Sequence, residues 1–158
     1  MAPQDDIDRI MGIMATAFDP AFGEAWTRRQ VEGAIFQPSC IYWLIAPDGT
    51  IGSDSRESAG FAMVRRVLDE AELLLFAVAP AWRRRGLGAS LLQKVQSDLA
   101  RDGVAQMMLE MRRGNPAQAL YCAYGFAPIG LRPQYYRSRE GTLLDAITFS
   151  CLLDEQDA

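Results

Sequence analysis

The sequence predicts an α/β domain, with a mixed β-sheet and helices on both faces. Apolar residues recur at helical spacing in some segments and run together or alternate in others, and Gly, Pro and Asn separate the segments. In chain order the segments predict two helices, three strands, a helix, a strand, a helix and two strands. With 158 residues and no internal repeat or linker, the chain (1–158) is expected to form a single domain.

The N-terminal half supplies the first five elements. Isoleucines and methionines at helical spacing mark the first helix, Thr27 is a suitable N-cap for the second, and Pro38 ends it. Residues 47–58 are rich in Gly, Asp and Ser and predict a long hairpin loop. Pro80 ends the last strand of this half. The expected elements are helices over 5–17 and 28–36 and strands over 40–46, 59–66 and 71–79.

The C-terminal half supplies the other five elements. A leucine-rich stripe marks a long helix, and Gly103 follows it as the C′ residue. Asn115 and Pro116 are expected to open a short helix as N-cap and first helical residue. Tyr135 and Tyr136 fall in the connection between the last two strands. The expected elements are helices over 87–102 and 116–125 and strands over 104–111, 126–131 and 142–152.

Composition excludes several kinds of chemistry. The chain has no histidine, which removes Ser-His-Asp triads, Cys-His dyads and histidine-ligated zinc. Cys40, Cys122 and Cys151 form no CxxC pair and are expected to be small core residues of a reduced protein. A net charge of −4 argues against nucleic acid, and no apolar run is long enough to cross a bilayer. We therefore expect a cytoplasmic protein without a nucleic-acid, membrane or metal partner.

The segment 76–90, FAVAPAWRRRGLGAS, carries the strongest functional signal. A buried strand leads through a proline into an Arg-Arg-Gly-Leu-Gly turn that opens a helix. Glycine lets a backbone turn tightly, and the N–H groups of such a turn and of a helix N-terminus form a cradle for phosphate. Arg84 and Arg85 would add positive charge at its rim. The segment therefore favours a ligand that carries a pyrophosphate.

Other interpretations of this turn stay open. An arginine cluster in an ordinary solvated turn would look the same. The P-loop pattern GxxxxGK[ST] is absent. A Rossmann site is a closer competitor, with Glu110 at the end of the next strand as its acid. Against it, Leu91 stands at the third glycine position, and Gly86 lies several residues beyond the strand.

Two longer segments extend the pattern to a known family. VAP followed by RRRGLGASLL resembles the acetyl-CoA signature R/Q-x-x-G-x-G/A of the GNAT acetyltransferase superfamily. LEMRRGNPAQALYCAYGF resembles that superfamily's LEVR-x-x-N…A-x-x-LY-x-x-x-GF segment. VLDEAELLLFAV, an early Trp-Thr pair and a late Tyr-Tyr pair resemble its RimI-type branch, the ribosomal-protein-alanine N-acetyltransferases. The likeness is densest over residues 67–149.

The resemblance implies the GNAT fold and acetyl-CoA as cosubstrate. Its mixed, mostly antiparallel sheet has splayed fourth and fifth strands, here 71–79 and 104–111, with the pantetheine arm between them. The N–H of Val78 would face the thioester carbonyl and stabilise the oxyanion. The acetyl-CoA contacts that the resemblance implies are Phe76, Ala77, Val78, Arg84, Arg85, Gly86, Leu87, Gly88, Ala89, Asn115 and Tyr124.

The resemblance also assigns catalytic roles. Glu110 matches the general base, and an α-amine with a pKa of about 8 needs only a modest base, directly or through water. Tyr121 matches the general acid that protonates the leaving thiolate. Without the motif, Glu110 would be interpreted as a surface acid paired with Arg112, and Tyr121 as a core aromatic. One residue fewer separates Glu110 from Tyr121 than in the superfamily pattern, and the difference falls near Asn115.

The acceptor implied by the resemblance is a protein N-terminus, the alanine of a small-subunit ribosomal protein. Tyr135 and Tyr136 match the aromatic pair that walls the peptide entrance. Arg137 and Leu144 depart from the Pro and Glu usual there. Two alternatives stay open: a GNAT enzyme acting on a lysine side chain, a polyamine or an antibiotic, and a non-catalytic acyl-CoA-binding protein. Covalent catalysis through Cys122 is a minor third possibility, with no histidine to activate the thiol.

Overall fold

The computed structural model describes residues 3–52 and 57–153, so part of the predicted 47–58 loop, residues 53–56, lies outside the described residues. The elements follow the predicted order. Helices and 3-10 turns are α1 (Pro3–Ala17), η1 (Pro20–Phe22), α2 (Arg28–Ile35), η2 (Pro80–Trp82), α3 (Leu87–Arg101) and α4 (Gln118–Ala123). Strands are β1 (Cys40–Ile45), β2 (Gly60–Val67), β3 (Glu70–Val78), β4 (Gln106–Arg112), β5 (Ala127–Arg137) and β6 (Leu143–Leu152).

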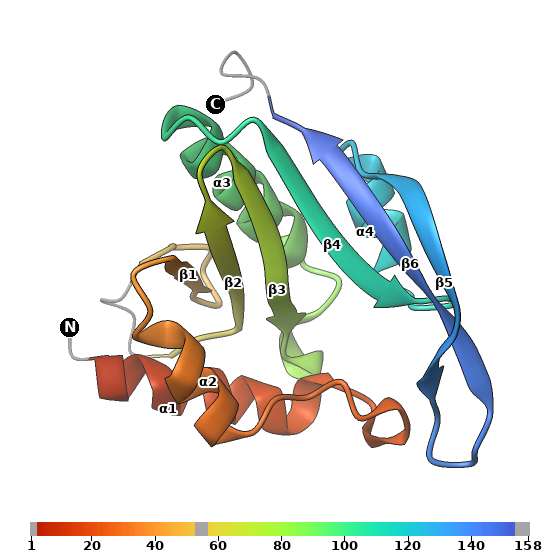
Figure 1. Cartoon of the computed structure of the whole chain (residues 1–158). Coiled ribbons are helices and arrows are strands. Elements are labelled where there is room, and N and C mark those ends of the chain that lie inside the picture. The colour runs from red at the N-terminus through yellow and green to blue at the C-terminus, as the bar shows by residue number, and fades with distance from the viewer. Residues whose placement is uncertain (1–2, 53–56, 154–158) are drawn as a thin grey trace.

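The six strands form one sheet in the order β1-β2-β3-β4-β6-β5. Neighbouring strands are antiparallel except β3 and β4, which are parallel because the crossover helix α3 connects them. Helices α1 and α2 cross one face of the sheet, and α3 and α4 pack on the other (Figure 1). The predicted α/β class, with a mostly antiparallel sheet and helices on both faces, is confirmed.

Two apolar cores hold these layers together. On one face, Ile10 of α1 and Val31 of α2 pack against residues of β1, β2 and β3 such as Phe61, and all three side chains are fully buried. On the other face, Leu91 of α3 and Phe149 of β6 belong to a larger core. Burying each such side chain stabilises the fold by about 1.5–3 kcal/mol. Because the described residues of the first core come from no strand beyond β3, α1 and α2 leave the same face of β4, β6 and β5 uncovered.

A bulge in β3 separates that strand from β4. Residues Met63 and Val64 of β2 pair with Leu75 and Leu73, so Leu74 is the extra residue of β3. A bulge bends its strand and increases the local twist. The three described pairs between β3 and β4 involve residues 70–72 and 106–108, and all lie before the bulge. The strands that the superfamily counts as fourth and fifth, here β3 and β4, therefore diverge toward their carboxyl ends, as expected.

The predicted boundaries differ from the structure by up to two residues, except at the end of β5, and two of the differences bear on the site. The strand expected over 126–131 continues as β5 to Arg137, so Tyr135 and Tyr136 lie on a strand, where Tyr136 pairs with Leu144 of β6. Helix α4 begins at Gln118, two residues after the predicted start. The first boundary depends on pairing between β5 and β6, which no local pattern in the sequence predicts. At the second, the side chain of the predicted cap, Asn115, accepts from the Ala117 N–H, one residue before the helix begins.

The cysteines differ in burial. Cys151 is buried, Cys40 is partly buried and Cys122 is exposed, so the expectation of three core cysteines is wrong for Cys122. Helix α4 turns Tyr121 inward and therefore turns the next residue outward. Within residues 3–52 and 57–153, no helix has the length and apolar character needed to cross a bilayer. The same ranges hold no group of three or more Cys, Asp or Glu side chains arranged to bind a metal ion.

Candidate active site

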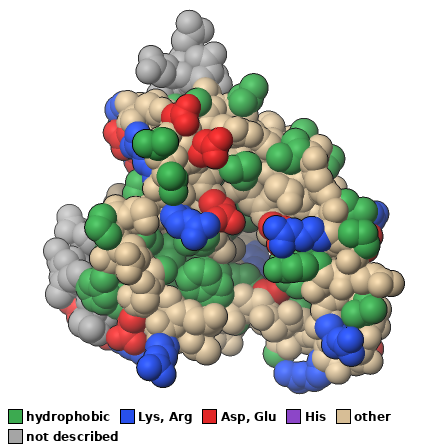
Figure 2. Space-filling view, viewed as in Figure 1, with side chains coloured by type: hydrophobic (Ala, Val, Ile, Leu, Met, Phe, Trp, Pro, Cys, Tyr) green, Lys and Arg blue, Asp and Glu red, His purple; other side chains and the backbone are tan. Residues whose placement is uncertain are grey.

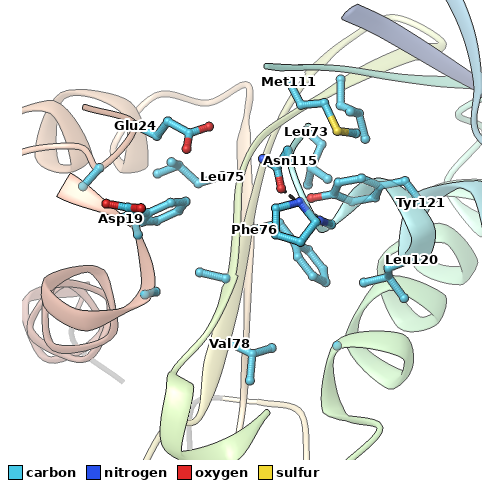
Figure 3. Close-up of a pocket in the computed structure, with 18 of the residues that line it drawn as sticks. Asp19, Glu24, Leu73, Leu75, Phe76, Val78, Met111, Asn115, Leu120 and Tyr121 are labelled. Carbon is cyan, nitrogen blue, oxygen red and sulfur yellow. Dashed lines mark hydrogen bonds between the residues drawn. The ribbon is translucent and has the colours of Figure 1, made fainter. Parts of the chain in front are cut away.

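A cavity of about 1090 Å³ lies where β3 and β4 diverge. Its walls come from the open edge of β3, from β4, from the turn before α3, from the start of α4 and from the segment between α1 and α2. In Figure 3, Asp19 and Glu24 lie on one wall, while Asn115 and Tyr121 lie across the cavity from them. Figure 2 shows a hollow in the middle of this face, with side chains of both charges around it.

The glycine turn has the geometry of an anion cradle. Gly86 is the N-cap of α3 with φ of +79°, a left-handed conformation that glycine adopts without strain, and a Cβ there would meet open space. A Cβ on Gly88 would lie 3.5 Å from Leu120 Cδ2. No side chain caps α3, so the first N–H groups of the helix remain available to a ligand. The residues present therefore fit a pyrophosphate.

The three arginines of the turn make different contacts. Arg83 donates from Nε to the Val78 carbonyl at 2.9 Å and from Nη2 to the Ala17 carbonyl at 2.6 Å. The Arg85 guanidinium stacks 5.0 Å from the centre of the Trp82 ring. Arg84 has φ of +64° and lines the cavity, whereas Arg85 does not. Of the two arginines that the sequence assigned to phosphate, only Arg84 lines this cavity.

The predicted acetyl-CoA residues of β3 lie along the open edge. Phe76, Ala77 and Val78 all line the cavity. The Ala79 N–H donates to the Ala59 carbonyl at 2.7 Å, on the β2 side. Successive N–H groups of an extended strand point to opposite edges, so the N–H of Val78 points toward the gap that β4 leaves.

Other predicted acetyl-CoA contacts fall into two groups. Leu87, Gly88 and Asn115 line the cavity, and the Asn115 Oδ1 accepts from the Ala117 N–H at 2.9 Å. That bond leaves the amide N–H₂ of Asn115 for other partners. Ala89 and Tyr124 do not line the cavity. The Tyr124 carbonyl instead accepts from Gln96 at 2.9 Å, on the side of α3 away from the cavity.

Glu110 lies on the uncovered face of the sheet. Its strand neighbours Leu109 and Met111 belong to the core under α3, so the Glu110 side chain points to the opposite face. Its Oε2 lies 3.3 Å from Arg132 Nε of β5, and the Thr148 hydroxyl donates to the same oxygen at 3.5 Å. The sequence suggested Arg112 as its ionic partner, and this is wrong.

Tyr121 approaches the same gap from the other face. Its ring belongs to the core under α3 and makes edge-on contacts with Phe76 at 5.9 Å and with Phe126 at 5.7 Å. Burial raises the pKa of Tyr121 above its ordinary value, and the Glu24 carboxylate raises that pKa further. The hydroxyl therefore stays protonated well above neutral pH. Glu110 and Tyr121 flank the opening between β3 and β4 from opposite sides of the sheet.

The two adjacent tyrosines of β5 stand at the Glu110 end of the cavity. Their rings meet edge to face, with centres 5.3 Å apart, and Arg132 lies 5.0 Å from the centre of the Tyr135 ring. Burial raises the pKa of Tyr136, and the carboxylates of Glu110 and Glu24 raise it further. The Tyr136 hydroxyl therefore lies within the electrostatic reach of both carboxylates.

Glu24 and Arg112 are the functional-site residues that the sequence did not single out. Arg112 Nε lies 3.2 Å from Glu24 Oε1, and the Arg112 guanidinium stacks 3.7 Å from the centre of the Phe22 ring. The two side chains are only 11% and 17% exposed. The pair joins residues far apart in the chain, and Glu24 sits in an irregular segment, so no spacing pattern could have found it.

Comparison with known proteins supports the same architecture. Residues 38–128 match a family model described as an acetyltransferase (GNAT) domain. The [ribosomal protein bS18]-alanine N-acetyltransferase of Haemophilus influenzae is 35% identical over 100 residues, which cover 63% of this chain and 68% of that protein. Its Escherichia coli counterpart is 43% identical over 84 residues, which cover 52% of this chain and 57% of that protein.

A solved structure extends the likeness over more of the chain. The crystal structure of the ribosomal-protein-S18-alanine N-acetyltransferase from Escherichia coli superposes with a TM-score of 0.81 at 30% identity. The superposition covers 95% of this chain and 89% of that one. The range matched by the family model holds the glycine turn, Glu110 and Tyr121, whereas Glu24 and the two tyrosines of β5 lie outside it.

Proposed function

We propose that this chain, which belongs to the GNAT acetyltransferase family and is an N-acetyltransferase, acetylates a protein N-terminus. In this proposal Glu110 is the general base and Tyr121 is the general acid. The observation that carries this proposal is the placement of the two side chains on opposite faces of one gap. An acceptor and a thioester can then meet in the gap from opposite sides, each beside the group that handles its proton.

The proposed reaction is a direct transfer. The neutral amine attacks the thioester carbonyl carbon, a C–N bond forms, and the C–S bond breaks. The proton lost by the amine goes to Glu110, directly or through a water molecule. The Tyr121 hydroxyl gives its proton to the departing sulfur. The N–H of Val78 donates to the oxygen that gains negative charge during the attack.

Acetyl-CoA is the cosubstrate that this site fits. The uncapped start of α3, Gly86 and Gly88 would hold the pyrophosphate, and Arg84 would add charge beside it. The open edge of β3 offers backbone groups to the pantetheine arm. Because Asn115 retains its amide N–H₂, it also suits a contact with the cosubstrate.

The proposed acceptor is an N-terminal alanine of a small-subunit ribosomal protein, which assigns the reaction to the cytoplasm. Two relatives named for bS18-alanine acetylation support this choice. The edge-to-face tyrosine pair beside Glu110 supports it too, because aromatic rings can wall a narrow entrance for a chain end. Arg132 holds both Glu110 and Tyr135, and so fixes the base relative to the entrance.

The test is an assay of thiol release from acetyl-CoA. One substrate is a short peptide with a free N-terminal alanine and one internal lysine, and the control is the same peptide with a blocked N-terminus. We expect turnover with the free N-terminus alone. Equal turnover with both peptides would contradict the N-terminal assignment and indicate lysine acetylation. Binding of acetyl-CoA without any turnover would contradict the catalytic roles.

A further inference from the structure

Glu24 brings a second carboxylate to the acceptor side of the cavity. It lies on the irregular segment between η1 and α2 and lines the cavity opposite Asn115 and Tyr121 (Figure 3). Its charge reaches the hydroxyls of both Tyr121 and Tyr136. Glu110 is the other carboxylate near Tyr136. The proposed reaction requires only one base, so Glu24 calls for a separate explanation.

One oxygen of the Glu24 carboxylate is available to a ligand. Arg112 engages Oε1, and the described residues provide no hydrogen bond to Oε2. Among those residues, Ser58 Oγ is the one buried side-chain oxygen or nitrogen without a partner, so Oε2 of Glu24 is not sealed in the protein. A carboxylate accepts up to about four hydrogen bonds. Glu24 lines the cavity, and Figure 3 shows its carboxylate group pointing into it.

Arg112 holds Glu24 through an ion pair, and Arg112 is itself held by a second contact. The guanidinium also stacks on the Phe22 ring, at 3.7 Å from its centre. Asp19, on the same wall, accepts from the Ala21 N–H at 2.9 Å through its Oδ1. Glu110, across the entrance, is paired with Arg132. Glu24 differs from both because its charge reaches the hydroxyls of Tyr121 and Tyr136 together, while its second oxygen is open to an incoming cation.

We propose that Glu24 binds the acceptor as a protonated primary amine and holds its ammonium group through Oε2. Glu110 then takes the ammonium proton and releases it to solvent, so that it can accept the second proton, which the amine loses during the attack. The inference rests on the proposed function and deepens it, because it assigns recognition and deprotonation to different carboxylates. An α-amine with a pKa of about 8 is mostly protonated at neutral pH, so the cation is the form that arrives. A charge-assisted hydrogen bond contributes selectivity for that form over a neutral group of the same shape.

The test compares two peptides that differ in one group. The first has an N-terminal alanine, and the second is identical except that it lacks the α-amine. Binding is measured by calorimetry in the presence of CoA, which carries no acetyl group to transfer. We expect the wild-type protein to bind the amine at least about ten-fold more tightly than the des-amino peptide. We expect Glu24→Gln to lose that difference and to raise KM for the peptide while KM for acetyl-CoA is unchanged.

Two further variants make the result decisive. Glu72→Gln is the matched control, because Glu72 also pairs with an arginine, Arg65, but lies outside the cavity. It should keep the ten-fold preference. If Glu24→Gln does not fold because Arg112 is left unpaired, the double variant Glu24→Gln/Arg112→Gln replaces the ion pair by a neutral pair and should also lose the preference.

The outcomes separate this inference from the proposed function. A preference for the amine that survives in Glu24→Gln or in the double variant overturns the role of Glu24, and so does a wild-type protein without that preference. Acetylation of the alanine peptide by the wild-type protein leaves the proposed function standing in either case. Failure of the wild-type protein to acetylate any peptide N-terminus overturns the proposed function instead.

Discussion

The two ends of β3 differ in what lies along their second edge. At residues 70–72 the strand has β2 on one side and β4 on the other, and Glu72 is held in an ion pair with Arg65. At residues 75–78 the strand still has β2, but β4 has moved away and the second edge faces the cavity. The first end carries two glutamates, Glu70 and Glu72, whereas the second is apolar. The extra residue at Leu74 is what separates a closed end from an open one.

The difference shows how a sheet acquires a binding edge in its interior. An exposed sheet edge is normally a liability, because its unpaired N–H and C=O groups attract other strands. Here the open edge faces a cavity lined by residues of β4, α3 and α4, inside the sheet and not at its rim. The residues proposed to act chemically, Glu110 and Tyr121, stand beside the open end and not beside the closed one.

Removing the proposed base should give the largest effect. Glu110→Gln keeps the shape of the side chain but cannot accept a proton, so kcat should fall by about 10²–10⁴ in the thiol-release assay. Acetyl-CoA affinity should not change, because Glu110 is remote from the glycine turn. Glu72→Gln, at the closed end, should leave kcat as it is. Wild-type turnover by Glu110→Gln would show that the open end of β3 does not have the base beside it.

Removing the proposed acid should come next. Tyr121→Phe keeps the edge-on contacts with Phe76 and Phe126, so the melting temperature should hardly change. The loss of the hydroxyl should lower kcat by about a hundred-fold. A donor whose thiol leaves easily, such as a thioester of an acidic thiol, should reduce that loss. An undiminished kcat with acetyl-CoA would show that the hydroxyl has no part in catalysis.

The end of β3 that pairs with β4 should contribute to the stability of the fold and have little effect on the reaction. Met107 is fully buried, and it pairs with Ala71 of β3 and Cys151 of β6. Met107→Ala should lower the free energy of unfolding by about 2–5 kcal/mol, measured by urea denaturation. The KM values of the remaining folded enzyme should stay close to the wild-type values. A stable variant with an altered KM would mean that the closed end also shapes the site.

The glycine turn should respond to a single methyl group. Gly86→Ala places a Cβ in open space, so its cost is the strain of φ at +79°, about 1 kcal/mol of stability. We expect KM for acetyl-CoA to rise as well, because relief of that strain moves the cradle. Gly141→Ala is the control, since φ there is +89° with equally open space, but Gly141 does not line the cavity. It should cost similar stability and leave KM unchanged.

The smallest expected effect concerns a pair outside the cavity. The Tyr42 hydroxyl donates to Asp6 Oδ2 at 2.6 Å, and burial together with that carboxylate raises the pKa of Tyr42 to about 12. An unfolded tyrosine loses its proton near pH 10, before the folded one does. The free energy of unfolding should therefore fall as the pH rises from about 10 toward 12.

Denaturation of the wild type and of Tyr42→Phe at about pH 9 and pH 11 measures this contribution. Because Tyr42 is partly exposed, solvent screening should limit the extra loss in the wild type to about 1 kcal/mol. The difference between the two proteins isolates Tyr42 from Tyr121 and Tyr136, whose pKa values are also raised. Equal losses in both proteins would contradict the role of the Asp6 contact.

Local patterns determined the order of the elements and the glycine turn. Thr27 caps α2, with its hydroxyl accepting from the Gln30 N–H, as its position in the sequence predicts. The left-handed conformation at Gly86 favours glycine, so this turn too can be recognised along the chain. The length of β5 could not be predicted, because its second half exists only through pairing with β6.

Patterns along the chain were enough to predict the fold class, the family and the stretch of backbone suited to phosphate, because each depends on residues close together in the sequence. Folding was needed to show that Arg132 and not Arg112 pairs with Glu110, and that Arg112 pairs with Glu24 instead. Those contacts join β4 to β5 and to the segment before α2. The partner of a charged side chain depends on which distant strands and loops the packed sheet brings within a few ångströms, and spacing along the chain does not encode that distance.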